Sequence, residues 1–312
     1  MELIADNIDL NDYTDGPDFR ASVRPVSDFA EQVKADLDPN APQDKSPGLL
    51  LRKTRGLLHF RSGDVSCWAG YNGHRKSMMT SQAAIDMAAQ GERVLIVSLE
   101  MLPWRTMSRM TRQATGMAHP TTEMIDKFNS WSKDKLWLFD HMGRIAPSRA
   151  LALCRYFAEV HQGTHIVLDS WMMICSTEEH LDEQKQFSTD LVRLAQETGL
   201  HIHVVAHCRK PNGLGGEDKP PTRYDIRGSA AISDQAATTM IVWMNKKKFA
   251  KLDLNPNDID ALNEPCGILK CDKQRHGPWE GAVQIWHDGA SLRFCDDRTS
   301  AVVPYGFVTD QE

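Results

Sequence analysis

Short apolar runs alternate with longer amphipathic stretches over most of this chain of 312 residues. The runs are largely uninterrupted and rich in β-branched residues, which is typical of strands that are buried on both faces. They occupy residues 65–69, 93–99, 136–140, 165–169, 200–207 and 238–244. Because helical stretches separate them at this spacing, the pattern predicts an α/β fold in which helices cover both faces of a mostly parallel sheet.

The stretches between the apolar runs have the period of amphipathic helices. The predicted helices cover residues 77–90, 103–115, 121–133, 148–161 and 182–198. Three further strands are expected at residues 266–272, 283–287 and 291–295. Two segments break the pattern: residues 208–231 are basic and rich in Gly and Pro, and residues 246–256 are expected to form a connection. A loop as long as the first usually has a function.

The beginning of the chain differs in composition from the rest of it. Residues 1–25 are acidic and rich in Asp, Asn and Gly, which predicts a poorly ordered leader. Ser27 is expected to cap a short amphipathic helix at residues 28–37. The apolar face of that helix consists of Phe29, Val33 and Leu37. A helix of about ten residues is marginal alone, so this face is expected to dock either on its own domain or on a neighbouring subunit.

Length and composition describe an ordinary globular protein. The chain is 41% hydrophobic and 25% charged, and its formal net charge of -6 argues against coating nucleic acid by bulk electrostatics, although it permits a local basic channel. No apolar run reaches about 18 residues, so neither a membrane span nor a secretory signal is expected. We expect a leader with a linker helix at residues 1–47, one large domain at 48–298 and a tail at 299–312.

Cysteine and histidine usage adds little chemistry. The seven cysteines are scattered, odd in number and without a C-x-x-C pair, which favours buried thiols in a reducing compartment such as the cytoplasm. His201 and His203 alternate along a predicted strand. For these two histidines a structural role is favoured over metal binding.

The most informative stretch begins with the apolar run at residues 65–69. It continues through Gly70, Gly73 and Arg75 into a predicted helix whose first turn carries Lys76, Ser77 and Met78. A strand, a glycine-containing turn and a helix start present free backbone N–H groups and a positive helix end at one point, as a polyphosphate requires. The Lys76 charge suits the outer phosphates, and the Ser77 hydroxyl suits a magnesium ion.

This stretch departs from the P-loop pattern G-x-x-x-x-G-K-[ST] at one position, because Arg75 stands where the second glycine is expected. If that position needs a positive φ, a side chain there costs roughly 1–2 kcal/mol. Two outcomes remain open at this point: Arg75 hinders the nucleotide and weakens turnover, or it reaches a phosphate itself.

Three further polar residues follow predicted strands. Glu100 comes after the run at residues 93–99, Asp169 ends the next strand but one, and His207 ends the strand that follows. In a parallel sheet the ligand lies beyond the carboxyl ends of the strands. These three side chains are therefore expected to converge beside the P-loop.

Six motifs in this order resemble the helicase domain of hexameric replicative DNA helicases. They are the P-loop, the strand endings at Glu100, Asp169 and His207, the Arg-Gly-Ser stretch at residues 227–229, and Lys-Gln-Arg-His-Gly-Pro at residues 273–278. The similar families are the DnaB type, the phage primase-helicases and Twinkle-like proteins. The resemblance covers roughly residues 48–295 and implies a RecA-like fold.

The resemblance also implies a role for each motif. Asp169 with Ser77 would hold Mg²⁺, Glu100 would orient the attacking water, and His207 would sense the terminal phosphate. Lys273 and Arg275 would reach into the nucleotide site of the neighbouring subunit. The remaining residues would line the channel for single-stranded DNA, namely Arg209, Lys210, Arg223, Arg227, Gly228 and Ser229.

The implied activity is that of an ATP-dependent DNA helicase that moves along single-stranded DNA as a hexameric or heptameric ring. Its cofactors would be ATP, or another NTP or dNTP, and Mg²⁺; a separate primase and a polymerase would be partners, and a phage origin is expected, which implies the host cytoplasm. Two alternatives remain open. One is a catalytically weakened ring protein that binds or loads DNA, and the other is a recombinase-type ATPase.

Overall fold

The computed structural model describes residues 2–5, 25–38, 44–175, 181–211, 216–228 and 230–306. Its strands are β1 (Glu2–Ala5), β2 (Val65–Gly70), β3 (Val94–Ser98), β4 (Leu136–Asp140), β5 (His165–Asp169), β6 (His201–His207), β7 (Thr238–Met244), β8 (Gly267–Gln274), β9 (Gly281–His287) and β10 (Phe294–Cys295). They form a single sheet in the order β1-β4-β3-β5-β6-β2-β7-β8-β9-β10. Neighbours from β1 to β7 are parallel, and those from β7 to β10 are antiparallel. The predicted mostly parallel sheet is confirmed.

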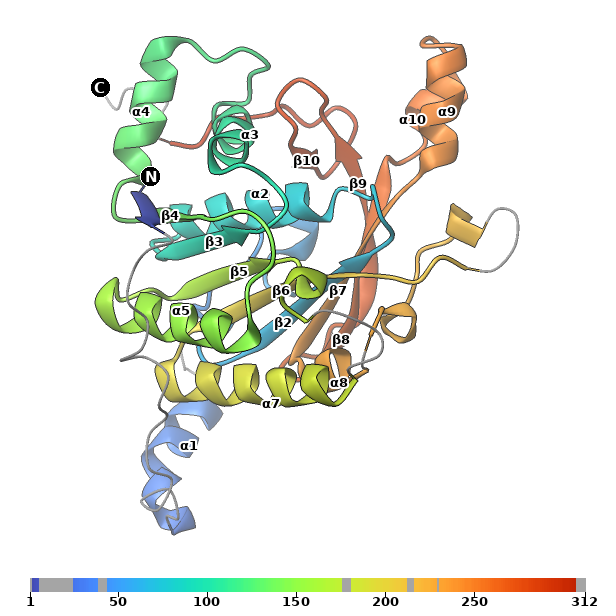
Figure 1. The fold of residues 1–312 in the computed structure, drawn as a ribbon. Coiled ribbons are helices and arrows are strands. Elements are labelled where there is room, and N and C mark those ends of the chain that lie inside the picture. Colours follow the sequence, from blue (N-terminus) through green and yellow to red (C-terminus); the bar gives the residue numbers. More distant parts are fainter. Residues whose placement is uncertain are drawn as a thin grey trace.

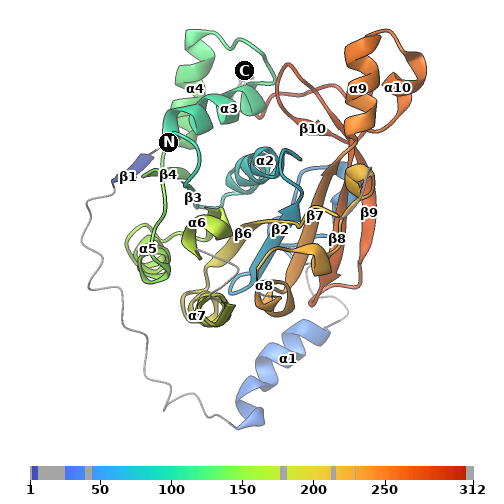
Figure 2. The same cartoon turned by 45° about the vertical axis from the view of Figure 1, so that its right-hand side comes forward.

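Helices cover both faces of this sheet, as predicted (Figures 1 and 2). The α-helices are α1 (Ala30–Leu37), α2 (Lys76–Ala89), α3 (Pro103–Thr115), α4 (Thr122–Ser132), α5 (Pro147–Val160), α6 (Trp171–Ile174), α7 (Leu181–Thr198), α8 (Ala231–Gln235), α9 (Lys246–Leu254) and α10 (Ile259–Asn263). Helices α2, α3 and α4 pack on one face with Trp68, while α5, α7 and α8 pack on the other with Cys67. None of the helices in the described ranges is long and apolar enough to cross a membrane.

Local signals explain why the helices begin and end where they do. Pro103 occupies the first turn of α3, and Gly116 ends it with a φ of 75°. The side chain of Thr121 caps α4 by accepting a hydrogen bond from the Met124 amide. These are the residue types that helix ends favour, because they satisfy or remove the unpaired backbone groups there.

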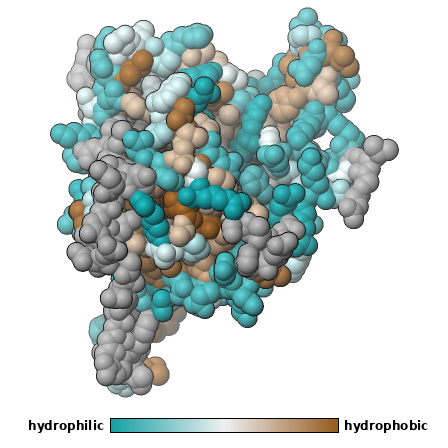
Figure 3. Space-filling model, in the orientation of Figure 1, coloured by the Kyte–Doolittle hydropathy of each residue, from teal (hydrophilic) through white to brown (hydrophobic). Residues whose placement is uncertain are grey.

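The segment that was expected to be an irregular connection is helical instead. Helices α9 and α10 form a hairpin between β7 and β8 that stands out from the body, and Figure 3 shows apolar surface on it. Asn245 and Asp258 cap the two helices through their side chains. At the tip, 89% of Leu254 and 70% of Ile259 are exposed.

The N-terminal expectations need two corrections. Residues Glu2–Ala5, predicted to belong to a poorly ordered leader, form β1 and pair with β4 in parallel. The predicted linker helix is present, but it starts with a 3-10 turn at Val26–Phe29, which contains Ser27, and no side chain caps that turn. The following α1 stands apart from the sheet (Figure 2), and 49% of Val33 and 73% of Leu37 are exposed.

Elsewhere the differences are small. The predicted strand at residues 291–295 shortens to β10, and Lys273 lies within β8 rather than in the turn after it. The long loop at residues 208–231 contains two 3-10 turns, Gly216–Asp218 and Arg223–Asp225. The four-residue helix α6 was not predicted.

Three histidines form a buried, hydrogen-bonded cluster at the amino ends of the strands. His201 lies 2.8 Å from the Ser66 hydroxyl, and His203 Nε2 lies 3.2 Å from His165 Nδ1. Trp68 donates to the other nitrogen of His203 at 3.2 Å. No group of metal-ligating side chains occurs among the residues that the structure describes. In the structure, the ring nitrogens of His201 and His203 are thus engaged by protein groups.

We expect the free energy of unfolding to fall as the pH drops below 6.5. Burial lowers the pKa of His201 to about 4 and those of His165 and His203 well below the ordinary value of 6.5. In this pH range the unfolded chain binds more protons than the folded one, so stability is lost on acidification. Each histidine contributes up to about 1.4 kcal/mol per pH unit. Urea unfolding at about pH 7.5 and about pH 5.5 measures the effect.

The matched variant is His203→Gln, which keeps a polar partner for its neighbours but does not titrate. Its loss of stability between the two pH values should be smaller than that of the wild type. The buried carboxyl of Asp86, whose pKa is raised to about 6, acts in the opposite direction but equally in both proteins. An equal loss in the two proteins would show that the cluster is not the cause.

Candidate nucleotide-binding site

The P-loop connects the carboxyl end of β2 to the first turn of α2. Gly70 is required there, because a Cβ atom on it would lie 2.3 Å from the Val242 carbonyl oxygen. Gly73 has a φ of 76° and Arg75 a φ of 59°, so the turn uses two left-handed residues. The Arg75 carbonyl accepts hydrogen bonds from the Met78 and Met79 amides and so starts the helix. The turn has the strand-to-helix geometry that holds phosphates.

Lys76 is buried in this turn. Its ammonium donates to the carbonyl oxygens of Gly70 at 3.1 Å and Tyr71 at 2.9 Å, and lies 3.1 Å from His207 Nδ1. Burial lowers the pKa of Lys76 to about 8, and the charge of Asp169 opposes that shift. Carbonyl oxygens carry no formal charge, so an anionic phosphate would stabilise the charged lysine better than these partners do.

The expected magnesium ligands also meet. Asp169 is buried at the end of β5, and the Ser77 hydroxyl lies close enough to its carboxylate to influence its pKa. Burial raises the pKa of Asp169, the Ser77 hydroxyl lowers it, and the nearby Glu100 raises it further. A hydroxyl beside a buried carboxylate is a hard oxygen donor set, so these residues fit Mg²⁺.

Glu100 follows β3 and lies beside His207. The Ser170 hydroxyl donates to Glu100 Oε1 at 2.6 Å, and His207 Nε2 lies 3.9 Å from the same oxygen. The approach of His207, together with the Ser170 hydrogen bond, lowers the pKa of Glu100 to about 2. Glu100 is therefore an ionised hydrogen-bond acceptor. The predicted convergence of strand-end residues beside the P-loop is present in the structure.

Arg75 turns toward α9. Its guanidinium carbon lies 4.9 Å from the centre of the Phe249 ring, a cation–π contact. The cations that act on the Asp169 carboxylate are Arg109 and Lys76. The backbone at this position does have a positive φ, and in the structure the Arg75 side chain stacks on Phe249.

Sequence reasoning missed Arg109, which lies on α3 and is largely buried. Its guanidinium donates to the Ser81 hydroxyl at 2.8 Å, and that hydroxyl in turn donates to the Ser77 carbonyl oxygen. Arg109 therefore fixes the helix that follows Glu100 against the first turns of α2. The available signal was that Arg109 lies beside the buried residues of α3, but an arginine in a helix is usually exposed.

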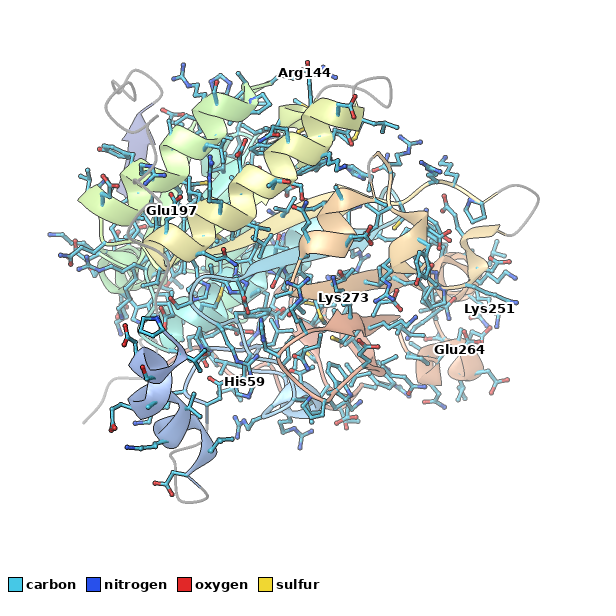
Figure 4. The ribbon with its side chains drawn as sticks, turned by 90° about the horizontal axis from the view of Figure 1, so that it is seen from below. His59, Arg144, Glu197, Lys251, Glu264 and Lys273 are labelled. Carbon is cyan, nitrogen blue, oxygen red and sulfur yellow. The ribbon has the colours of Figure 1, made fainter. Side chains whose placement is uncertain are left out.

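Lys273 and Arg275 lie level with the amino ends of the parallel strands, whereas the P-loop of their own chain lies at the carboxyl ends. Gln274 pairs with Thr238, the first residue of β7, whereas the P-loop follows the last residue of the parallel strand β2. Thr238 pairs with Ser66, four residues before Gly70, which corresponds to about 13 Å along a strand. Lys273 donates to the carbonyl oxygens of Ser233 and Asp234 in α8, far from the hairpin residues Lys251 and Glu264 (Figure 4).

The loop after β6 is joined directly to the site. The Arg227 amide donates to the His207 carbonyl oxygen at 2.8 Å, and the Arg209 amide donates to the Asp225 carbonyl oxygen at 2.7 Å. Arg209, Lys210 and Arg227 are exposed.

Two of the other residues that were predicted to contact DNA, Arg223 and Gly228, make contacts within the protein. Asp272 accepts from the Arg223 amide at 2.6 Å, and the Arg223 side chain also donates to the Asp272 carbonyl oxygen at 3.3 Å. Gly228 is buried with a φ of 88°, and a Cβ atom there would lie 2.2 Å from Gln184 Oε1, so it shapes the loop. Ser229 lies outside the described residues.

This sheet, with a phosphate-binding turn at its carboxyl edge, defines a P-loop ATPase domain of the RecA-like kind. The chain belongs to the AAA domain family, whose model matches residues 52–213. The fold is shared with a solved ATPase domain, at 13% identity and a TM-score of 0.66, over 90% of this chain and 99% of that one. A DnaB-like replicative helicase, described with its interactions with primase, matches at 13% identity and a TM-score of 0.68, over 88% of this chain and 67% of that one. The predicted resemblance to replicative helicase domains is confirmed in the fold.

We expect Arg75→Gly to leave nucleotide turnover within about threefold of the wild type, because the guanidinium does not act on the buried carboxylate of the site. Glycine relieves about 1–2 kcal/mol of left-handed strain but loses a contact with Phe249 of similar size. The change in unfolding free energy should therefore be small, within about 1 kcal/mol. Steady-state phosphate release and urea unfolding provide the two measurements.

Arg75→Ala is the matched control, since it loses the Phe249 contact and keeps the strain. It should be less stable than both other proteins. Turnover that appears only in the glycine variant would contradict this expectation and would favour a catalytically weakened protein.

Proposed function

We propose that this chain is an NTP-driven DNA helicase motor that moves along single-stranded DNA as a ring. The observation that carries the proposal is the separation of the P-loop from Lys273 and Arg275 by the length of a strand. One subunit cannot bring both groups to one nucleotide, whereas a head-to-tail arrangement of identical subunits can. The fold shared with replicative helicase domains supports the same interpretation.

At the nucleotide site, the P-loop amides and Lys76 bind the phosphates, and Ser77 and Asp169 hold the magnesium ion. The ion, when bound, neutralises charge on the phosphoryl oxygens. Glu100 orients the attacking water through its ionised carboxylate. A carboxylate whose pKa is lowered to about 2 is a weak base, so its contribution is positioning more than proton abstraction.

At the seam between two subunits, Arg275 of one reaches the phosphates held by the other and stabilises the charge of the transition state, as arginine fingers do. Within the described residues, the Arg275 guanidinium donates one hydrogen bond, a long one of 3.4 Å to the Asp234 carbonyl oxygen. The guanidinium can therefore leave that partner at little cost.

The exposed apolar face of α1 supports the ring as well. Val33 is about half exposed and Leu37 is mostly exposed, although burying each such side chain fully is worth roughly 1.5–3 kcal/mol. We propose that this face docks on the neighbouring subunit, one of the two occupants expected from the sequence. On the inner side, Arg209, Lys210 and Arg227 hold the DNA phosphates without reading bases.

The proposal predicts that Arg275→Ala and Lys76→Ala are each inactive alone but active when mixed. Lys76→Ala lacks a working P-loop and keeps its finger, while Arg275→Ala has the reverse defect. In a random mixture, about one seam in four joins an intact P-loop to an intact finger, so up to about a quarter of the wild-type rate returns. Phosphate release and strand displacement on a 5′-tailed fork are both measured.

Nucleotide binding by Arg275→Ala should stay close to that of the wild type, which separates loss of the finger from loss of the site. If the mixture stays inactive, or if Arg275→Ala turns over normally, the trans-acting finger is wrong. Strand displacement that is absent while filaments form would favour the recombinase-type alternative.

A second prediction concerns assembly. Replacing both Val33 and Leu37 with Ser should shift the protein from rings to smaller species, because the apolar docking face is lost. Lys34→Ser, on the same helix, removes a residue whose side chain pairs with Glu31 and should leave assembly unchanged. Mass measurement in the presence of nucleotide and an oligonucleotide reports the outcome; rings in both variants would exclude α1 as the docking helix.

A further inference from the structure

The long loop after β6 touches the P-loop at a point that the proposed mechanism does not use. Its 3-10 turn Gly216–Asp218 lies against the end of β7 and the start of α9. Trp243 Nε1 donates to the Glu217 carbonyl oxygen at 2.8 Å, and the Lys246 ammonium donates to Glu217 Oε2 at 2.6 Å. The turn is thus fixed through its backbone and its side chain at once.

The same carboxylate faces a P-loop residue. His74 is fully buried, and its Nδ1 accepts a hydrogen bond from the Met244 amide at 3.0 Å. That bond requires the proton of the neutral ring to be on Nε2. Nε2 is buried without a hydrogen-bond partner among the described residues, and Glu217 Oε2 lies 3.5 Å from it. A buried donor therefore points at a carboxylate that is slightly too far away.

An unsatisfied buried donor of this kind costs roughly 1–3 kcal/mol, which a closer approach of the carboxylate would recover. Since β7 holds both His74 and the backbone of the turn, the part that can move is the Glu217 side chain in this turn, whose ion pair with Lys246 is partly exposed. This turn belongs to the loop that also carries Arg209, Lys210 and Arg227. A small shift of the loop when it binds single-stranded DNA would therefore change the distance between Glu217 and His74 in the phosphate-binding turn.

We propose that Glu217 is a positioning residue that couples single-stranded DNA on the loop to nucleotide in the P-loop, by closing on His74. The inference rests on the proposed function, because it requires the loop to bind DNA. A contact can couple two ligands only if it differs between the free and bound states, and a gap of 3.5 Å without ligands leaves room for the contact to tighten. By linkage, the coupling acts equally in both directions.

The test measures the affinity for a fluorescent, non-hydrolysable ATP analogue with and without oligo(dT). In the wild type, the oligonucleotide should tighten nucleotide binding by about fivefold or more, within the usual range of allosteric coupling. In Glu217→Ala this factor should fall to within about twofold of unity, while affinity without DNA changes by less than about twofold. A purely structural role would instead alter the affinity without DNA.

Two variants sharpen the comparison. Glu217→Asp keeps the negative charge near Lys246 but is one methylene shorter, so it cannot reach His74 and should also lose the coupling. Asp218→Ala removes the neighbouring 2.6 Å pair with Lys247, which does not involve the P-loop, and should keep wild-type coupling.

Each outcome decides a different question. Wild-type coupling in Glu217→Ala, or an equal loss in Asp218→Ala, overturns the inference and leaves the proposed function standing. Failure of the wild type to bind oligo(dT) in either nucleotide state overturns the proposed function, and this inference with it.

Discussion

The site depends on opposite charges that are buried together at the carboxyl edge of the sheet. Lys76 and Asp169 have both lost most of their hydration, and burial moves their pKa values in opposite directions, toward the neutral forms. Their mutual attraction, the Ser77 hydroxyl and the P-loop carbonyls oppose that shift. These interactions do not fully offset the loss of hydration of the two charges, since both pKa values remain shifted toward the neutral forms. A nucleotide with its metal ion would supply negative charge to Lys76 and positive charge to Asp169, which is what the two groups lack.

Much of the fold could be predicted because the sheet core has an unambiguous pattern. Strands such as β5 and β7 are buried along their whole length, and their sequences contain few residues that fit any other structure. The site followed from the same pattern, since the parallel order places Glu100, Asp169 and His207 at one edge. The hydrophobic pattern and the positions of the strand ends are therefore sufficient to predict that these three side chains lie together.

What the sequence did not reveal depends on contacts between distant segments. Helix α9 is short and begins with three lysines, so it is marginal alone. It is held by Lys248, which donates to the Glu264 carbonyl oxygen at 2.5 Å, and by the stacking of Arg75 on Phe249. Arg109 was missed for a similar reason: its partner Ser81 lies on another helix. The position of Arg75 likewise depended on an aromatic ring that is more than a hundred and fifty residues away along the chain.

The antiparallel return of β8 beside β7 has a mechanical consequence. It places the proposed finger at one end of a hydrogen-bonded sheet and the phosphate-binding turn at the other, so the two are joined by a stiff element rather than by a hinge. In an assembly of the proposed kind, a shift at one nucleotide would pass through the subunit as a tilt of the whole body. The tilt of one subunit would then be passed to the next, and the displacement at the finger would scale with the length of the strand that separates it from the phosphate-binding turn.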